Sequence, residues 1–152
     1  MTADREADCP LCLAAGEQVL WRNAELRIVL AADADYPGFC RVILNAHVRE
    51  MSDLDAAAQA RIMTVVFAVE RVLREQLAPD KINLASLGNQ VPHLHWHVIP
   101  RFVNDAHFPD PVWAARKRPG TARPVDAAAL AAALACALDI ADISKELGIF
   151  RD

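Results

Sequence analysis

The feature that most constrains the fold is the alternating segment His93-Leu94-His95-Trp96-His97-Val98. Because successive side chains of a β-strand point to opposite faces, this alternation predicts a strand with the three histidines on one face and Leu94, Trp96 and Val98 in the core. A neutral imidazole can bind a metal, take up a proton or attack phosphorus, so such a row has several chemical uses. A row of solvated histidines is the alternative, but the strict alternation favours a functional site.

The rest of the chain predicts an α+β fold. Apolar segments predict strands at residues 19–21, 26–31, 39–44, 82–87 and 94–99, and helical spacing predicts helices at about 52–77 and 126–147. Ser52 with Asp55 resembles a capping box at the start of the longer helix. Strands grouped before and after one long helix are typical of an antiparallel sheet. We therefore expect about five antiparallel strands, one long packed helix and a C-terminal helix.

Length and composition exclude several classes of protein. The 152 residues are about one domain's length, and 54% hydrophobic with 24% charged residues excludes intrinsic disorder. The net charge of −4 argues against nucleic acid or an anionic membrane as the partner, since both bind clustered Lys and Arg. No apolar stretch reaches the ~18–20 residues of a membrane helix, and the first residues lack the apolar core of a signal peptide. We expect a cytoplasmic protein whose four cysteines stay reduced, namely Cys9, Cys12, Cys40 and Cys136.

Two chemistries compete for the histidine row. In metallohydrolases a pair of alternating histidines is commonly joined by a nearby aspartate, and here no acidic residue follows until Asp105. The other chemistry is covalent catalysis by one histidine at a phosphoryl centre. The segment Cys9-Pro10-Leu11-Cys12 is equally open, because such a cysteine pair is half of a zinc site, a redox motif or two unrelated thiols.

Two parts of the chain resemble the histidine triad (HIT) superfamily. The alternating histidine signature of the superfamily is similar to the run from His93 to Ile99 together with Asn83 and Gly88. The superfamily's strand-to-helix segment is similar to residues 45–54. The resemblance covers roughly residues 9–103. It implies a HIT-like fold in a single domain, residues 1–152, with residues 104–152 as a C-terminal extension.

The resemblance implies a bacterial HIT-type nucleotide hydrolase. Such an enzyme cleaves at the α-phosphate of a dinucleoside polyphosphate, for example diadenosine tetraphosphate, or of a nucleoside phosphoramidate. His95 would be the nucleophile of a nucleotidyl-histidine intermediate, from which water releases a nucleoside monophosphate. His97 would hold phosphate oxygens and assist the leaving group. The implied substrate contacts are Asn83, Gly88, Asn89 and Asp33, with Asp35 as easily the acid near the ribose.

The resemblance also implies a metal. Some relatives bind zinc through a cysteine pair, the first histidine of the triad and an upstream histidine, which match Cys9, Cys12, His93 and His47. Four such ligands close a tetrahedral shell, so the implied ion is structural Zn²⁺, and no organic cofactor is implied. The implied partner is a small-molecule nucleotide rather than nucleic acid or membrane, and a homodimer is expected because family members commonly dimerise.

The sequence departs from the family's pattern at Phe39, where many members carry a histidine. This change leaves the nucleophile in place and bears on substrate identity and rate. Three other functions stay open: nucleotidyl transfer to an acceptor other than water, non-catalytic nucleotide binding, and zinc-dependent hydrolysis. Transferases of the superfamily often carry glutamine as the third triad residue, so His97 favours hydrolysis.

Overall fold

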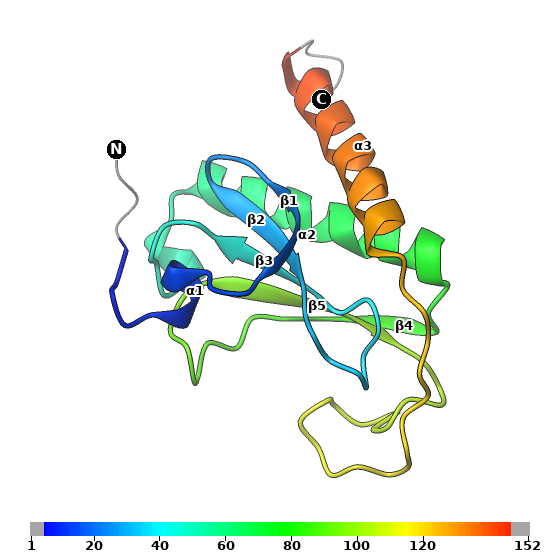
Figure 1. Ribbon diagram of the computed structural model, residues 1–152. Coiled ribbons are helices and arrows are strands. Elements are labelled where there is room, and N and C mark those ends of the chain that lie inside the picture. Colours follow the sequence, from blue (N-terminus) through cyan, green and yellow to red (C-terminus); the bar gives the residue numbers. More distant parts are fainter. Residues whose placement is uncertain (1–4, 147–152) are drawn as a thin grey trace.

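The computed structural model describes residues 5–146, which form one sheet with helices packed against it (Figure 1). In chain order the elements are α1 (Pro10–Leu13), β1 (Gln18–Arg22), β2 (Leu26–Leu30), β3 (Cys40–Leu44), a 3₁₀ turn (Met51–Asp53), α2 (Ala56–Leu77), β4 (Lys81–Ala85), β5 (His95–Arg101) and α3 (Ala127–Glu146). The predicted α+β class is confirmed, with five antiparallel strands, a long helix and a C-terminal helix. Leu147, where that last helix was expected to end, lies outside the described residues. The short helix α1 is an addition to the expected elements.

The long helix begins later than its sequence indicates. Asp55 is the N-cap of α2, and its carboxylate accepts a hydrogen bond of 2.7 Å from the backbone N–H of Ala58. The preceding residues, Met51–Asp53, form a separate 3₁₀ turn. The capping box predicted for Ser52 and Asp55 is therefore wrong, because Asp55 alone satisfies a free N–H group at the start of the helix.

The strands lie in the order β1-β2-β3-β5-β4, and all neighbours are antiparallel. This order places β5 in the interior of the sheet, between β3 and β4. In the β3–β5 ladder Arg41 lies opposite His97 and Ile43 opposite His95. The histidine row thus has a hydrogen-bonded neighbour on each side, which fixes the direction of its side chains.

The hydrophobic core lies between the sheet and its two long helices. The buried side chains of α2 (Ile62, Val65, Val66, Ala68, Val69, Val72 and Leu73) pack against apolar residues of the strands. Three leucines of α3 (Leu130, Leu134 and Leu138) join the same core. None of the described helices combines the length and apolar content needed to span a bilayer.

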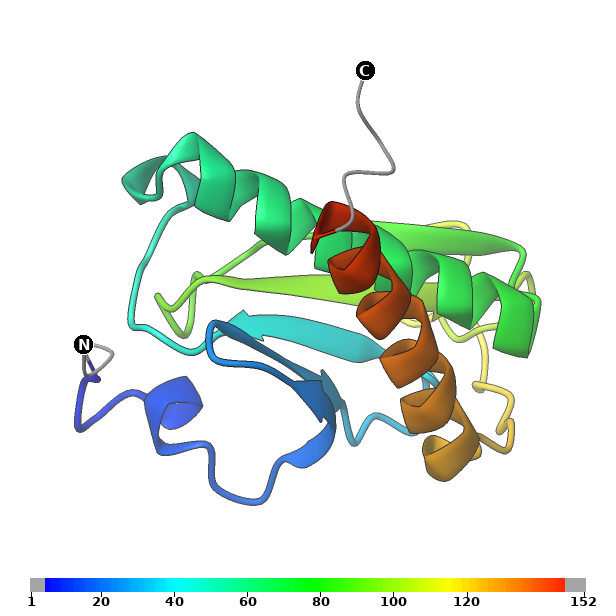
Figure 2. The same cartoon turned by 90° about the horizontal axis from the view of Figure 1, so that it is seen from above.

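The histidines face away from this core. Leu94 and Val98 are buried in the core and Trp96 packs against it, as the alternation predicts. By the same alternation, His95 and His97 lie on the opposite face of the sheet. The helix α2 covers one face of the sheet and leaves the other uncovered (Figure 2). His93 precedes the first residue of β5, so its ring enters a different cluster from the rings of His95 and His97.

Candidate active site and metal centre

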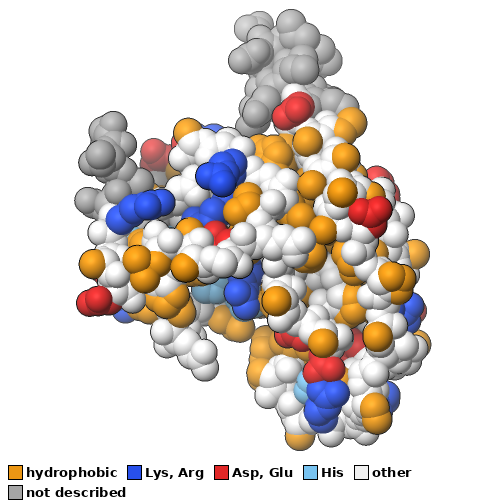
Figure 3. Space-filling view, in the orientation of Figure 1, with side chains coloured by type: hydrophobic (Ala, Val, Ile, Leu, Met, Phe, Trp, Pro, Cys, Tyr) orange, Lys and Arg blue, Asp and Glu red, His pale blue; other side chains and the backbone are white. Residues whose placement is uncertain are grey.

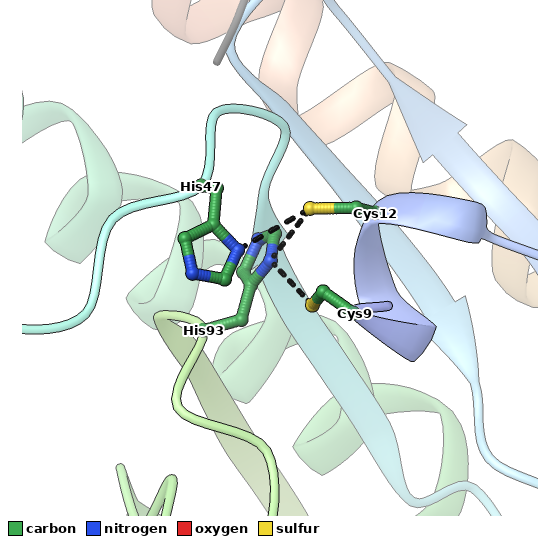
Figure 4. Close-up of side chains that lie close together, drawn as sticks. All are labelled: Cys9, Cys12, His47 and His93. Atoms are coloured by element: carbon green, nitrogen blue, oxygen red, sulfur yellow. Dashed lines mark hydrogen bonds between the residues drawn. The ribbon is translucent and has the colours of Figure 1, made fainter. Parts of the chain in front are cut away.

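Four side chains of the types that bind metals meet near the start of β5 (Figure 4). Cys9 and Cys12 come from the α1 segment, His47 from the segment after β3, and His93 from the segment before β5. Their ligand atoms all lie within 4.8 Å of one another, and all but the half-buried His47 are buried. Segments far apart in the sequence therefore join at one point.

The distances in this cluster fit a tetrahedral metal ion. Nδ1 of His93 lies 3.4 Å and 3.5 Å from the sulfurs of Cys9 and Cys12, and Nδ1 of His47 lies 3.3 Å from the sulfur of Cys12. Typical zinc bond lengths at a tetrahedral angle require a sulfur–nitrogen separation of about 3.5 Å. Nε2 of His93 donates to the Leu44 carbonyl at 2.6 Å, which leaves the lone pair of Nδ1 facing the sulfurs. The four residues could therefore hold a metal.

His95 is held by the backbone of the preceding histidine. Its Nδ1–H donates to the His93 carbonyl at 2.6 Å, so a neutral ring keeps its lone pair on Nε2. The side chain is buried, and burial lowers the pKa of His95 although this hydrogen bond opposes the shift. A neutral imidazole with one nitrogen fixed and the other free is suited to nucleophilic attack.

His97 lies beside it, with ring centroids 4.8 Å apart. Nε2 of His97 is buried and has no hydrogen-bond partner among the described residues. Burial, together with the neighbouring His95 and Arg41, lowers the pKa of His97 to about 4, so its ring is neutral at pH 7. Buried polar atoms nearly always have a partner, and a phosphate oxygen would supply one here.

A cavity of about 530 Å³ opens over these two rings. Arg41 lines it beside the histidines, residues 87–91 form one wall, and Leu11 of α1 and Trp113 of the loop before α3 contribute the rest. Figure 3 shows a notch between two projections of the surface, with histidine and Lys or Arg atoms at its edge. The volume of the cavity is that of a binding site for a small molecule.

The far end of β5 is anchored by a buried ion pair. Nε of Arg101 lies 2.6 Å from Oδ2 of Asp105, and Nη2 lies 3.1 Å from Oδ1. Burial raises the pKa of Asp105, but the hydrogen bonds from Arg101 and from two backbone N–H groups outweigh it and lower that pKa to about 2. Nη2 of Arg101 also donates to the Asp110 carbonyl at 2.8 Å, which ties the loop carrying Trp113 to the sheet.

The family model described as HIT domain matches residues 14–104, more than half of the chain. The chain belongs to the HIT domain family. A solved histidine triad protein from Bradyrhizobium japonicum is 33% identical, with a TM-score of 0.65 over 80% of this chain and 90% of that one. A zinc-bound histidine triad family protein from Mycobacterium smegmatis has the same fold at 22% identity, with a TM-score of 0.60 over 90% of this chain and 97% of that one.

Two curated relatives match a shorter stretch. A bis(5'-adenosyl)-triphosphatase from Saccharomyces cerevisiae is 28% identical over 92 residues, which are 57% of this chain and 45% of the relative. An AP-4-A phosphorylase from Mycobacterium tuberculosis is 31% identical over 78 residues, which are 47% of this chain and 40% of the relative. The chain thus spans less than half the length of the curated relatives it matches.

Not all of the substrate contacts expected for this HIT protein lie at the cavity. Gly88 and Asn89 line it. Asn83 accepts a hydrogen bond of 2.7 Å from Nη1 of Arg101 and is outside the cavity lining. Asp33 lines a separate surface hollow, where its carboxylate accepts a hydrogen bond of 3.0 Å from the backbone N–H of Asp35.

Arg41 is a site residue that sequence reasoning missed. A signal was available, because Arg41 is the one charged residue in the strand predicted at residues 39–44. Alternation within that strand places Arg41 opposite in direction to Cys40 and Val42, which are in the core. Leu11 had no such signal, since α1 is too short to show a helical pattern.

Proposed function

We propose that this chain is a nucleotide hydrolase that cleaves at the α-phosphate through a covalent nucleotidyl-histidine intermediate. The observation that carries the proposal is the hydrogen bond of 2.6 Å from Nδ1 of His95 to the His93 carbonyl, which leaves Nε2 as the nucleophilic atom of a ring that lines the cavity. The names of two relatives, a bis(5'-adenosyl)-triphosphatase and an AP-4-A phosphorylase, support an adenine dinucleotide as the substrate.

In the first step the lone pair on Nε2 of His95 attacks the α-phosphorus. A nitrogen–phosphorus bond forms, the bond from phosphorus to the leaving group breaks, and its electron pair goes to the leaving oxygen or nitrogen. The hydrogen bond at Nδ1 stabilises the positive charge that the ring acquires, because the His93 carbonyl accepts from that N–H. His97 would contact a non-bridging oxygen through Nε2 and assist the leaving group.

In the second step water attacks the same phosphorus. The nitrogen–phosphorus bond breaks, its electron pair returns to Nε2 of His95, and a nucleoside monophosphate and a proton are released. The backbone N–H groups near Gly88 and Asn89, which line the cavity, would stabilise charge on the phosphate oxygens.

We also propose that Cys9, Cys12, His47 and His93 bind structural Zn²⁺. Two sulfurs and two Nδ1 atoms are a donor set that zinc prefers, and four protein ligands leave no position for substrate. When bound, the ion supplies a cross-link between α1 and the start of β5. In this arrangement His93 acts on catalysis only through its carbonyl, which positions the ring of His95.

The test is the release of AMP from diadenosine tetraphosphate and from adenosine phosphoramidate without added divalent metal. We expect the wild-type protein to release AMP and His95→Ala to release none while it still binds AMP. Binding without turnover in the wild type would instead support a non-catalytic nucleotide-binding protein. Turnover that a chelator abolishes while the protein stays folded would support zinc-dependent hydrolysis.

A second candidate is transfer of the nucleotidyl group to inorganic phosphate. The observation that favours it is the 31% identity to an AP-4-A phosphorylase over 78 residues. Phosphate in place of water would break the same nitrogen–phosphorus bond and give ADP rather than AMP. Chromatography of the products formed with and without added phosphate distinguishes water from phosphate as the acceptor. We expect AMP as the product in both reactions.

Two expectations from the sequence stay predictions. The resemblance to the family leads us to propose a homodimer, which sedimentation equilibrium would check. The cytoplasmic location would be checked by fractionation of the producing cells.

A further inference from the structure

One charged side chain of the cavity has no anionic partner within the part of the chain that the structure describes. Three arginines point to the uncovered side of β2, β3 and β5, and two of them are paired: Arg27 with Glu17 at 2.7 Å and Arg101 with Asp105 at 2.6 Å. The side chain of Arg41 makes no hydrogen bond or ion pair with any residue that the structure describes, and its Nε is buried. A guanidinium is always charged, so an unpaired and partly desolvated one is costly unless an anion binds it.

The position of Arg41 relates it to the reacting groups. It lies directly opposite His97 in the β3–β5 ladder. Its guanidinium carbon lies 5.3 Å from the ring centroid of Phe39, and that ring lies 5.3 Å from the ring of His97. Among the described residues of β3 and β5, those that line the cavity are Arg41, His95 and His97.

The charge of the cavity comes from Arg41 alone. None of the described residues that line it is acidic, and no other lysine or arginine lines it. The cavity therefore carries a net positive charge placed to one side of the nucleophile. A ligand with several negative charges matches this better than one with a single charge.

We propose that Arg41 binds a phosphate beyond the one that His95 attacks, and that it makes this chain selective for dinucleoside polyphosphates over nucleoside phosphoramidates. This proposal rests on the proposed function. When the bond between the α-phosphorus and the bridging oxygen breaks, the electron pair goes to that oxygen and the departing polyphosphate gains negative charge. Arg41 would stabilise this charge. In adenosine phosphoramidate the electron pair of the phosphorus–nitrogen bond goes to nitrogen, which takes up a proton from water and leaves as neutral ammonia, so it presents no such charge.

The experiment compares kcat/KM for diadenosine tetraphosphate and adenosine phosphoramidate in the wild type and in Arg41→Gln. Both substrates supply the same adenylyl group to His95, so the ratio of their kcat/KM values reports the effect of the leaving group alone. We expect the ratio of polyphosphate to phosphoramidate to fall ~10- to 100-fold in Arg41→Gln, the range for one hydrogen-bonded charge. Arg41→Lys keeps the charge without the planar fork and should recover part of the ratio.

The matched control is Arg71→Gln, an exposed arginine of α2 that lies outside the cavity lining. It removes the same charge and should leave the ratio unchanged. Equal losses on the two substrates in Arg41→Gln would overturn the proposal, because Arg41 would then act on the α-phosphate or on the fold.

A second measurement keeps the inference separate from the proposed hydrolysis. If the wild type releases AMP from neither substrate, the hydrolase proposal fails, and binding of inorganic tripolyphosphate by calorimetry then decides the role of Arg41. We expect Arg41→Gln to bind tripolyphosphate ~10-fold more weakly than the wild type and Arg71→Gln. Equal affinity in all three proteins would overturn the inference.

Discussion

The residues that flank the histidine face of β5 and the residues on that face use the same kinds of side chain in opposite ways. Just before β5, the Leu44 carbonyl engages Nε2 of His93 and two sulfurs engage its Nδ1. At the last residue of β5, Asp105 engages Arg101. Between them, Nε2 of His97 is buried and has no partner among the residues that the structure describes. Buried polar groups are normally paired, and Nε1 of Trp96 on the core side is unpartnered as well. His97 and Arg41 differ from Trp96 because they line the cavity, which makes them candidates for contacts to a ligand.

The two kinds of site are also connected. The carbonyl of His93 accepts the hydrogen bond that orients His95, and Leu11, a wall of the cavity, lies between the two cysteines of the metal cluster. The backbone carbonyl of Leu11 further accepts a hydrogen bond of 2.5 Å from Nη2 of Arg27. The anchored segment before β5 therefore positions both the ring of His95 and part of the pocket.

The largest expected effect comes from a change on the histidine face of β5, at the first residue of the strand. His95→Gln removes the nucleophile but keeps a polar side chain of similar length. We expect AMP release from diadenosine tetraphosphate to fall at least ~1000-fold, with the melting temperature and metal content unchanged. Retained turnover in this variant would show that His95 does not form the covalent bond.

A change at the metal cluster should have the reverse profile. In His93→Gln we expect zinc content to fall and the melting temperature to drop by on the order of 10 °C, because the cross-link between α1 and β5 is lost. The measurements are metal analysis and calorimetry of the purified protein. Cys136→Ser is the control, since Cys136 is exposed on α3 and outside the cluster. Full stability in metal-free His93→Gln would contradict the structural role.

The opposite end of β5 gives a test by pH. The pKa of Asp105 is about 2 in the folded protein and about 3.9 when unfolded, so the unfolded chain binds more protons between these values and stability falls as pH drops from about 4 to 2. Asp105→Asn should therefore cost about 3 kcal/mol at pH 7, and the gap to wild type should narrow below pH 4. Urea unfolding of the wild type and of Asp105→Asn at several pH values measures this difference in the free energy of unfolding.

A matched control exists for this ion pair. Asp110 pairs with Lys117 at 2.9 Å, but both side chains are over 40% exposed. Asp110→Asn should cost less than about 1 kcal/mol, because exposed pairs contribute little. Equal costs for the two substitutions would remove the distinction between the anchored end and the surface.

The smallest expected effect concerns the wall of the cavity. Leu11→Ala shortens an apolar side chain that lines it, and we expect KM for diadenosine tetraphosphate to rise about threefold. Leu13→Ala is the same substitution in the same short helix, at an exposed position outside the cavity lining. Steady-state kinetics of both variants measures the two KM values. Equal changes in KM would contradict the assignment of Leu11 to the wall of the cavity.

How far the sequence predicted these features depends on the range of the interaction. The alternation from His93 to Val98 predicted a strand and its core-facing side chains, because strand geometry repeats every two residues. The meeting of Cys9 with His93 depends on chain segments 84 residues apart, and only the family resemblance pointed to it. The ion pair of Arg101 with Asp105 follows from a loop conformation, which carries no periodic signal.

The direct test of the central claim is the stereochemistry at the α-phosphorus. A substrate with a chiral α-phosphorothioate would be hydrolysed in water enriched in heavy oxygen, and the configuration of the released nucleotide would be determined by NMR. Two successive displacements, first by Nε2 of His95 and then by water, predict retention of configuration. Inversion would show a single attack by water and would contradict covalent catalysis by His95.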